Sequence, residues 1–265
     1  MIKELTAIEL IDSNLLGGST KPWLIRAESF EGEIGDYVIK IFTDKQIREG
    51  FSINKEIFAS ILARQFDLKT PEVAFIKISN NFIKLLPDEI KSRIESTSSR
   101  VLFGSKYISS PLNYTPALRN KYLKEYDIET IFAFDTFIFN MDRVKRKPNL
   151  FFHQGFCYLI DHELSLIYNK PFEEYKKNNI LYARYSFERR HIFLDYLKKS
   201  KNEITFDTFA YYLDLINLKE LEIAAKQLAD YGYDVSDFHY ISEYIKGVKN
   251  DKLGFINILK TAIQL

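Results

Sequence analysis

The chain has 265 residues, of which 46% are apolar and 28% charged, a balance typical of a folded globular protein with one large domain or two packed lobes. Its formal net charge of +1 argues against a dedicated nucleic-acid binder, because phosphate contacts usually require a clear basic excess. The single cysteine, Cys157, excludes an intramolecular disulfide and a cysteine-based zinc site, and no apolar run approaches the roughly 20 residues of a membrane-spanning helix. We therefore expect a cytoplasmic protein with no direct nucleic-acid or membrane partner.

Short β-branched and aromatic runs near the N-terminus predict strands. The first three cover residues 6–11, 22–27 and 37–42, and a glycine-bearing loop at 17–20 separates the first two. This order favours an antiparallel meander with a loop over one face.

The segment 51–66 changes to helical spacing, with Ile53, Ile57 and Ile61 on one face, and Pro71 lies beyond its end. Three further elements are predicted before the sequence becomes mainly helical. They are a strand at 73–78, a short helix at 82–94 and a buried strand at 101–108.

Beyond this point the sequence is mainly helical. The apolar run at 128–140 predicts a buried helix, and two short strands follow at 150–152 and 156–160. Periodicity predicts four later helices, at 206–216, 218–231, 235–246 and 252–263. We therefore divide the chain into a β-rich N-terminal lobe, 1–110, and a mainly helical C-terminal lobe, 111–265.

Polar residues gather around the two short strands. Asp142 and Asn149 lie in the loop after the buried helix, and Asp161 directly follows the second strand. Phosphoryl transfer needs an Asp near the attacking hydroxyl, and an Asn and an Asp that hold Mg²⁺. Upstream, Lys40 lies in a strand after the glycine loop, and Glu56 lies on the next helix, where it is able to pair with that lysine.

In this ordered set of features the chain resembles the HipA-like kinases, bacterial relatives of the eukaryotic-type protein kinases. The matching segments are LLGGSTKPWLI, YVIKIF, NKEIFASILAR, FGSKYI, FDTFIFNMDRVKRKPNLFF and LIDHELSL, which together span about residues 15–166. The resemblance implies an α+β, two-lobed protein-kinase-like fold, with a small, mainly antiparallel-β N-lobe carrying one helix and a larger, mainly helical C-lobe. It also implies an ATP- and Mg²⁺-dependent serine/threonine protein kinase.

The resemblance assigns roles to individual residues. Asp142 looks like the catalytic aspartate, and Asn149 and Asp161 look like the Mg²⁺ ligands. Lys40 looks like the lysine that contacts the ATP phosphates, with Glu56 as its partner.

The resemblance also assigns a phosphate-covering loop, made of Gly17, Gly18 and Ser19. In related kinases a serine of this loop is autophosphorylated, which leads to the hypothesis that Ser19 or Thr20 is modified here.

Two features depart from the usual kinase pattern. Six residues separate Asp142 from Asn149, where the usual catalytic loop has four, and Asp161 is followed by His162 and Glu163 rather than Phe-Gly. We expect His162 to be a structural hydrogen-bonding group. The basic run of Arg143, Lys145, Arg146 and Lys147 is compatible with a solvated loop or with a dock for an acidic substrate.

Members of the resembled family act as toxins, phosphorylate aminoacyl-tRNA synthetases and are restrained by an antitoxin. The resemblance therefore implies a protein substrate, such as an aminoacyl-tRNA synthetase or another translation factor, and an antitoxin partner. Two alternatives remain open on the same fold: a small-molecule kinase, and a catalytically silent pseudokinase that binds nucleotide.

Overall fold

The structure is a computed structural model that describes residues 1–13, 15, 22–95, 97, 99–115, 120–177 and 191–264. It is an α+β protein whose chain divides into two compact units. Unit 1 comprises residues 1–58, 71–109 and 220–235, and unit 2 comprises residues 59–70, 110–219 and 236–265.

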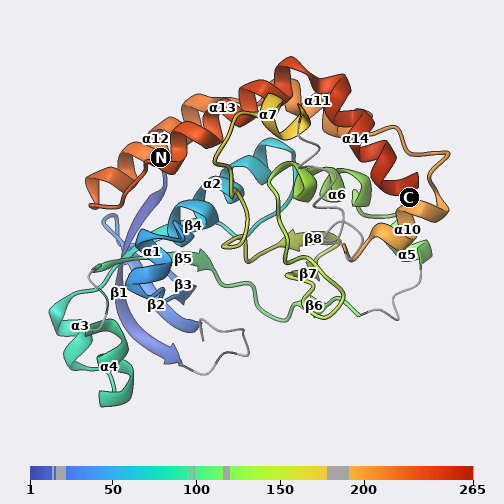
Figure 1. Cartoon of the computed structure of the whole chain (residues 1–265). Helices are drawn as coiled ribbons and strands as arrows, with labels where there is room; N and C mark the ends of the chain where they lie inside the picture. The colour runs from blue at the N-terminus through green and yellow to red at the C-terminus, as the bar shows by residue number, and fades with distance from the viewer. Residues whose placement is uncertain are drawn as a thin grey trace. The chain divides into compact units, whose positions relative to one another are not determined.

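Unit 1 is built on a closed barrel of five strands (Figure 1), namely β1 (Lys3–Asp12), β2 (Trp23–Ser29), β3 (Ile34–Lys40), β4 (Val73–Lys77) and β5 (Val101–Lys106). The strand order is β1-β2-β3-β5-β4, and β1 closes the barrel by pairing with β4 in parallel. The other pairs are antiparallel, so the predicted meander of the first three strands is confirmed.

The barrel interior is filled by alternate residues of its strands, among them Trp23, Ile25 and Ile39, which are almost completely buried. Gly104 on β5 lies where the barrel is most crowded, because a Cβ atom there would lie 2.5 Å from Cγ1 of Ile76. The barrel therefore has little room for additional side-chain volume at this position.

Helices also belong to unit 1, and the expectation of one helix in the N-terminal part is wrong. They are α1 (Asp44–Arg48), the first half of α2 (Ser52–Gln65), α3 (Asn80–Lys84), α4 (Asp88–Glu95) and α12 (Leu218–Asp230). The segment predicted as one helix at 82–94 forms two, α3 and α4, because Pro87 has no amide hydrogen to continue α3.

Helix α12 packs on the barrel, although the sequence-based division assigned it to the C-terminal part. The ring of Tyr231 lies 5.0 Å from that of Phe75 on β4, and Gln227 accepts a hydrogen bond from the backbone of Ile2 at 2.9 Å. These contacts, between residues more than 140 positions apart, are not visible in local sequence patterns.

Unit 2 combines a three-stranded antiparallel sheet, ordered β6-β7-β8, with helices. The strands are β6 (Leu112–Asn113), β7 (Leu150–His153) and β8 (Phe156–Leu159), and the helices are α5 (Asn120–Leu123), α6 (Ile128–Phe137), α7 (Phe172–Lys177), α10 (Leu194–Lys199), α11 (Asp207–Leu215), α13 (Asp237–Asn250) and α14 (Lys252–Gln264). The predicted helix at 128–140, the two predicted strands and the four predicted late helices are confirmed, with ends displaced by a few residues.

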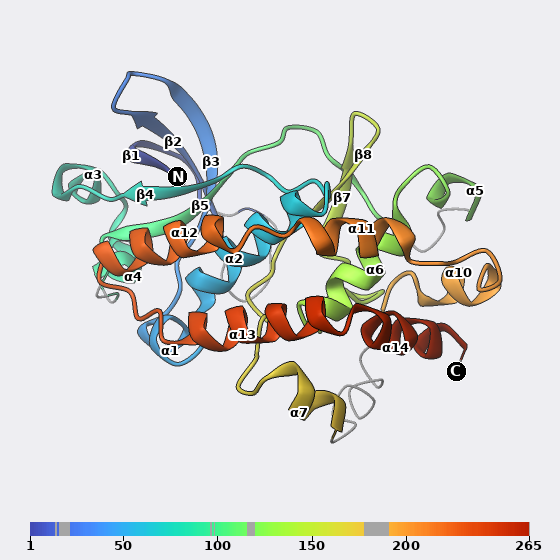
Figure 2. The ribbon, with the colours of Figure 1, turned by 90° about the horizontal axis from the view of Figure 1, so that it is seen from above.

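Helix α6 is the centre of unit 2, and all of its residues except Glu129 are buried. Its C-terminal residue Phe137 packs against rings from three other helices, Phe209 of α11, Tyr244 of α13 and Phe255 of α14, with centroids 5.9–6.0 Å apart. Figure 2 shows α11 running beside α6. The loop that leaves α6 therefore starts from a rigidly packed support. Among the described residues, no helix combines the length and apolarity that crossing a membrane requires.

Candidate active site

The candidate site in unit 2 starts where α6 ends. Phe139 adopts a left-handed backbone conformation, with φ at 53°, which stops the helix. The next residue, Asn140, turns back to the helix, because its side-chain amide donates to Oδ1 of Asp135 at 2.8 Å. The chain thereby enters the loop that carries Asp142 in a defined direction.

A buried ionic network holds this loop against α6. The carboxylate of Asp135 accepts from Nε of Arg143 at 2.5 Å and lies 2.9 Å from Nε2 of His191. The Arg143 guanidinium also donates to the carbonyl of Asn149, and its side chain has no exposed surface. Burial alone would raise the pKa of Asp135, but Arg143 and His191 outweigh it and hold that pKa far below its ordinary value. The network fixes both ends of the segment 143–149 to one helix.

A tight turn explains the six residues between Asp142 and Asn149. The backbones of Val144 and Lys147 exchange two hydrogen bonds, of 3.1 and 2.9 Å. The residues between them form the tip of this turn. The longer loop therefore accommodates a turn without separating Asp142 from Asn149.

Asn149, Asp142 and Asp161 lie together at the base of this turn. The side-chain amide of Asn149 donates to Oδ2 of Asp142 at 3.1 Å and to its carbonyl at 3.2 Å. The amide of Ile160 donates to the carbonyl of Asn149 at 3.0 Å, which places the segment after β8 next to the loop. Asn149 and Asp161 both have positive φ, 49° and 62°. Such conformations are uncommon outside glycine and concentrate at functional sites.

Lys147 bridges the two aspartates. Its ammonium contacts Oδ2 of Asp142 and lies 3.0 Å from Oδ2 of Asp161, whose side chains are 18% and 17% exposed. Burial lowers the pKa of Lys147, but the two carboxylates outweigh it, and the net result is a raised pKa. Asp142 and Asp161 therefore share one cation, and Asn149 joins the group through its hydrogen bonds to Asp142.

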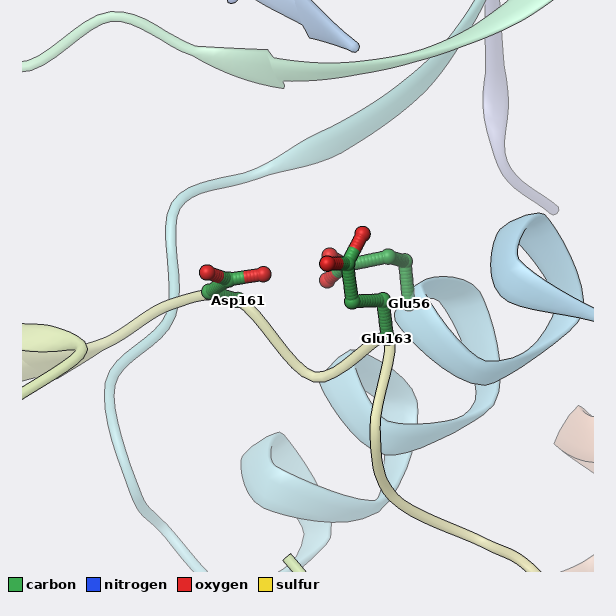
Figure 3. A group of neighbouring side chains, drawn as sticks. All are labelled: Glu56, Asp161 and Glu163. Carbon is green, nitrogen blue, oxygen red and sulfur yellow. The ribbon is translucent and has the colours of Figure 1, made fainter. Parts of the chain in front are cut away.

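The donors in this group suit a hard divalent cation. Carboxylate and amide oxygens are the ligands that Mg²⁺ prefers, and an asparagine that donates through Nδ2 keeps its Oδ1 available as an acceptor. Figure 3 shows Asp161 and Glu163 on the segment that follows β8, and a carboxylate oxygen of each lies within 4.8 Å of the other. The chemistry of Asn149 and Asp161 therefore fits the predicted magnesium ligands.

Within unit 1, Lys40 and Glu56 form the ion pair that the sequence predicts. Lys40 is the last residue of β3, and its ammonium contacts Oε1 of Glu56 on α2. The two side chains are 13% and 2% exposed, so the pair is largely shielded from solvent. The remaining predicted residues, Gly17, Gly18 and Ser19, lie outside the residues that the structure describes, as does Thr20.

The basic run after Asp142 is not a solvated group of free charges. Arg143 is buried against Asp135, Lys145 pairs with Asp195 at 2.5 Å, and Lys147 bridges the aspartates. The fourth cation, Arg146, is exposed. His162 is buried, and its Nε2 lies 3.4 Å from Nη2 of Arg143, which agrees with the structural role expected for it.

Sequence reasoning missed three members of this arrangement: Asp135, His191 and the bridging role of Lys147. Asp135 had a detectable signal, because it is the one acid in the middle of the apolar run FAFDTF. An ionisable residue inside a buried helix requires a partner. His191 lies more than 40 residues beyond the loop, so nothing local connects it to Asp135.

Comparisons with known proteins show which fold and which family the chain resembles. The fold is similar to the crystal structure of the proinflammatory kinase CtkA from Helicobacter pylori, with a TM-score of 0.51, 12% sequence identity, and coverage of 100% of this chain and 99% of that chain. A search of curated protein sequences found no match. The model of the HipA-like kinase family matches residues 8–217, well over half of the sequence. The chain therefore belongs to the HipA-like kinase family.

Proposed function

We propose that the chain is an ATP- and Mg²⁺-dependent serine/threonine protein kinase with a two-lobed, protein-kinase-like arrangement. The observation that carries this proposal is the grouping of Asp142, Asn149 and Asp161 at the end of one buried helix and one strand. Their order and residue types meet the requirements of phosphoryl transfer, which depends on positioning and charge neutralisation more than on covalent chemistry.

In this proposal Asp142 acts on the acceptor. The hydroxyl oxygen of a substrate serine or threonine forms a bond to the γ-phosphorus while the bond from that phosphorus to the bridging oxygen breaks. The electron pair leaves on ADP, and the hydroxyl proton passes to the Asp142 carboxylate. The hydrogen bond from Asn149 and the network around Asp135 hold Asp142 in position.

The nucleotide is held by the other predicted residues. Asn149 and Asp161 would hold Mg²⁺, which neutralises charge on the phosphates when it is bound. Lys40 contacts the phosphates, and Glu56 orients its ammonium. Gly17, Gly18 and Ser19 cover the nucleotide in this proposal, and autophosphorylation of Ser19 or Thr20 remains part of it.

For the acceptor we propose a protein, such as an aminoacyl-tRNA synthetase or another translation factor, in the cytoplasm, with an antitoxin as regulator. This choice follows what the resemblance of the sequence implies, and the near-zero net charge speaks against nucleic acid as a direct partner.

Transfer of labelled γ-phosphate tests the proposal. The purified chain would be incubated with Mg²⁺ and labelled ATP, in parallel with a cell lysate and with a panel of hydroxyl-bearing metabolites. We expect Mg²⁺-dependent labelling of protein, and mass spectrometry should place the label on serine or threonine. Asp142→Asn and Asp161→Asn should each abolish it. Asp195→Asn, which changes a mostly exposed aspartate that pairs with Lys145, is the matched control and should remain active.

Two outcomes would replace the proposal. Labelling of a metabolite but of no protein would identify a small-molecule kinase. Binding of ATP without transfer to any acceptor would identify a pseudokinase.

A further inference from the structure

The most unusual contact in the described part of unit 2 is the position of Lys147. One ammonium contacts the carboxylates of both Asp142 and Asp161, although the three residues come from different parts of the loop and from the segment after β8. The side chain of Lys147 is 37% exposed, whereas that of Lys145, two residues earlier, is 58% exposed and pairs with Asp195. The two lysines of the same turn therefore form ion pairs with different carboxylates.

The backbone directs Lys147 to this place. Its amide and carbonyl both bond to Val144 across the turn, and Pro148 restricts it to an extended conformation. The carbonyl of Asn149, the residue after Pro148, accepts from the buried guanidinium of Arg143. The Cα atom of Lys147 is thus held by a closed turn on one side and a buried network on the other, while four flexible carbons carry its charge.

The place between these two carboxylates has a chemical meaning in the proposed function. In that function Asp142 would take the proton of the attacking hydroxyl, and Asp161 would hold the metal ion that neutralises charge on the phosphates. The phosphoryl group that moves between ATP and the hydroxyl must pass between these two functions. A cation there meets the negative charge of the equatorial oxygens of that group.

We propose that Lys147 is a further catalytic residue of this kinase: its ammonium, which lies against Asp142 and Asp161, contacts the transferred phosphoryl group during the reaction. This inference rests on the proposed function. Lys147 stays protonated throughout and donates hydrogen bonds only, so the proton of the acceptor still passes to Asp142 and the electron pair still leaves on ADP. A divalent cation on Asp161 would repel the ammonium, and the oxygens of the phosphoryl group would attract it. The flexible lysine stem permits this change of partner.

Substitution of Lys147 tests the inference, with Lys145→Met as the matched control on the same turn. Lys147→Met keeps the length and apolar stem but removes the charge. We expect transfer of labelled γ-phosphate to fall about 100-fold, the typical effect of removing one charge-stabilising donor. Lys147→Arg keeps the charge and should recover activity to within about tenfold of the wild type. Lys145→Met should retain wild-type activity.

A second measurement does not depend on turnover. Calorimetric titrations in the presence of Mg²⁺ would compare the binding affinity of ADP with that of a non-hydrolysable ATP analogue. If Lys147 contacts the γ-phosphoryl group, Lys147→Met should weaken binding of the analogue about tenfold and leave binding of ADP nearly unchanged, which corresponds to the loss of one hydrogen bond to a charged group. A merely structural role would change both affinities together.

The outcomes separate the two proposals. Absence of ATP turnover in the wild-type protein overturns the proposed function, and this inference with it. An active wild type whose Lys147→Met variant transfers phosphate at a similar rate, or loses ADP and analogue affinity in parallel, overturns the role of Lys147 alone.

Discussion

The buried network around Asp135 gives the sharpest stability prediction. Asp135→Asn keeps the shape of the side chain but removes the charge that balances Arg143. The Asp135 and Arg143 side chains are 1% and 0% exposed, so water cannot take over the role of the carboxylate. The asparagine also presents only one oxygen to Arg143 and His191, which both contact Oδ2 in the wild type.

The expected loss follows from this burial. Removing one partner of a buried ion pair costs roughly 3–5 kcal/mol, because the other charge remains in a site without compensation. We expect a value near 3 kcal/mol, since the remaining oxygen of the asparagine still accepts a hydrogen bond. For a chain of this size that corresponds to a fall of about 6–12 °C in the unfolding midpoint.

Urea unfolding followed by far-ultraviolet circular dichroism measures this loss. Arg143→Met and the double variant Asp135→Asn/Arg143→Met complete a double-mutant cycle. The double variant should be more stable than the sum of the single losses predicts, because it removes both members of the ion pair and leaves neither of them buried without its partner. A loss below about 1 kcal/mol for Asp135→Asn, or strictly additive losses in the cycle, would refute the reasoning.

The same carboxylate predicts a dependence of stability on pH. Its pKa in the folded protein lies below the ordinary value of about 3.9, so its contribution is present above that value and is lost as pH falls through the folded pKa. The stability difference between wild type and Asp135→Asn should therefore be largest near neutral pH and shrink in acid. A difference that grew as pH fell would contradict the assigned ionisation.

Three further changes test other parts of the structure. Glu56→Gln removes the countercharge of Lys40. We expect the free energy of unfolding, measured by thermal unfolding, to fall by roughly 1.5–3 kcal/mol, and ATP binding measured by calorimetry to weaken. Unchanged ATP affinity would contradict the role of the pair. Burial raises the pKa of the Cys157 thiol to about 12, so little reactive thiolate is present at pH 8. Ellman's reagent at pH 8 should therefore modify the native protein at least about 100-fold more slowly than the urea-unfolded chain. Fast labelling of the native protein would show that the thiol is not buried. Gly104→Ala places a methyl group against Ile76, and the barrel should lose about 1–3 kcal/mol in urea unfolding monitored by tryptophan fluorescence, a loss that an unchanged midpoint would disprove.

Local sequence patterns predicted most elements of the fold. The period-2 runs became β1 to β5, β7 and β8, and the helical spacing of apolar residues predicted α2, α6 and the four late helices. These predictions succeed because each depends only on residues that lie close together in the sequence. Short elements such as α7 and α10 were missed, because six residues carry little periodicity.

The chain order of polar residues likewise pointed to Lys40, Glu56, Asp142, Asn149 and Asp161 as candidates. The expected pair of Lys40 with Glu56 is present, and the hydrogen bond from Asn149 to Asp142 was not predicted. Their catalytic roles stay predictions that the variants above test. What the sequence determined by itself is therefore on which elements these candidate residues lie.

Only the tertiary structure decided which charged side chains form ion pairs with one another. In the sequence Arg143, Lys145 and Lys147 form one basic run, yet they pair with Asp135, with Asp195 and with the two aspartates Asp142 and Asp161. The physical reason is that electrostatic pairing depends on distance and burial in space. Those quantities arise from packing between segments that lie far apart in the chain, and no local pattern encodes them.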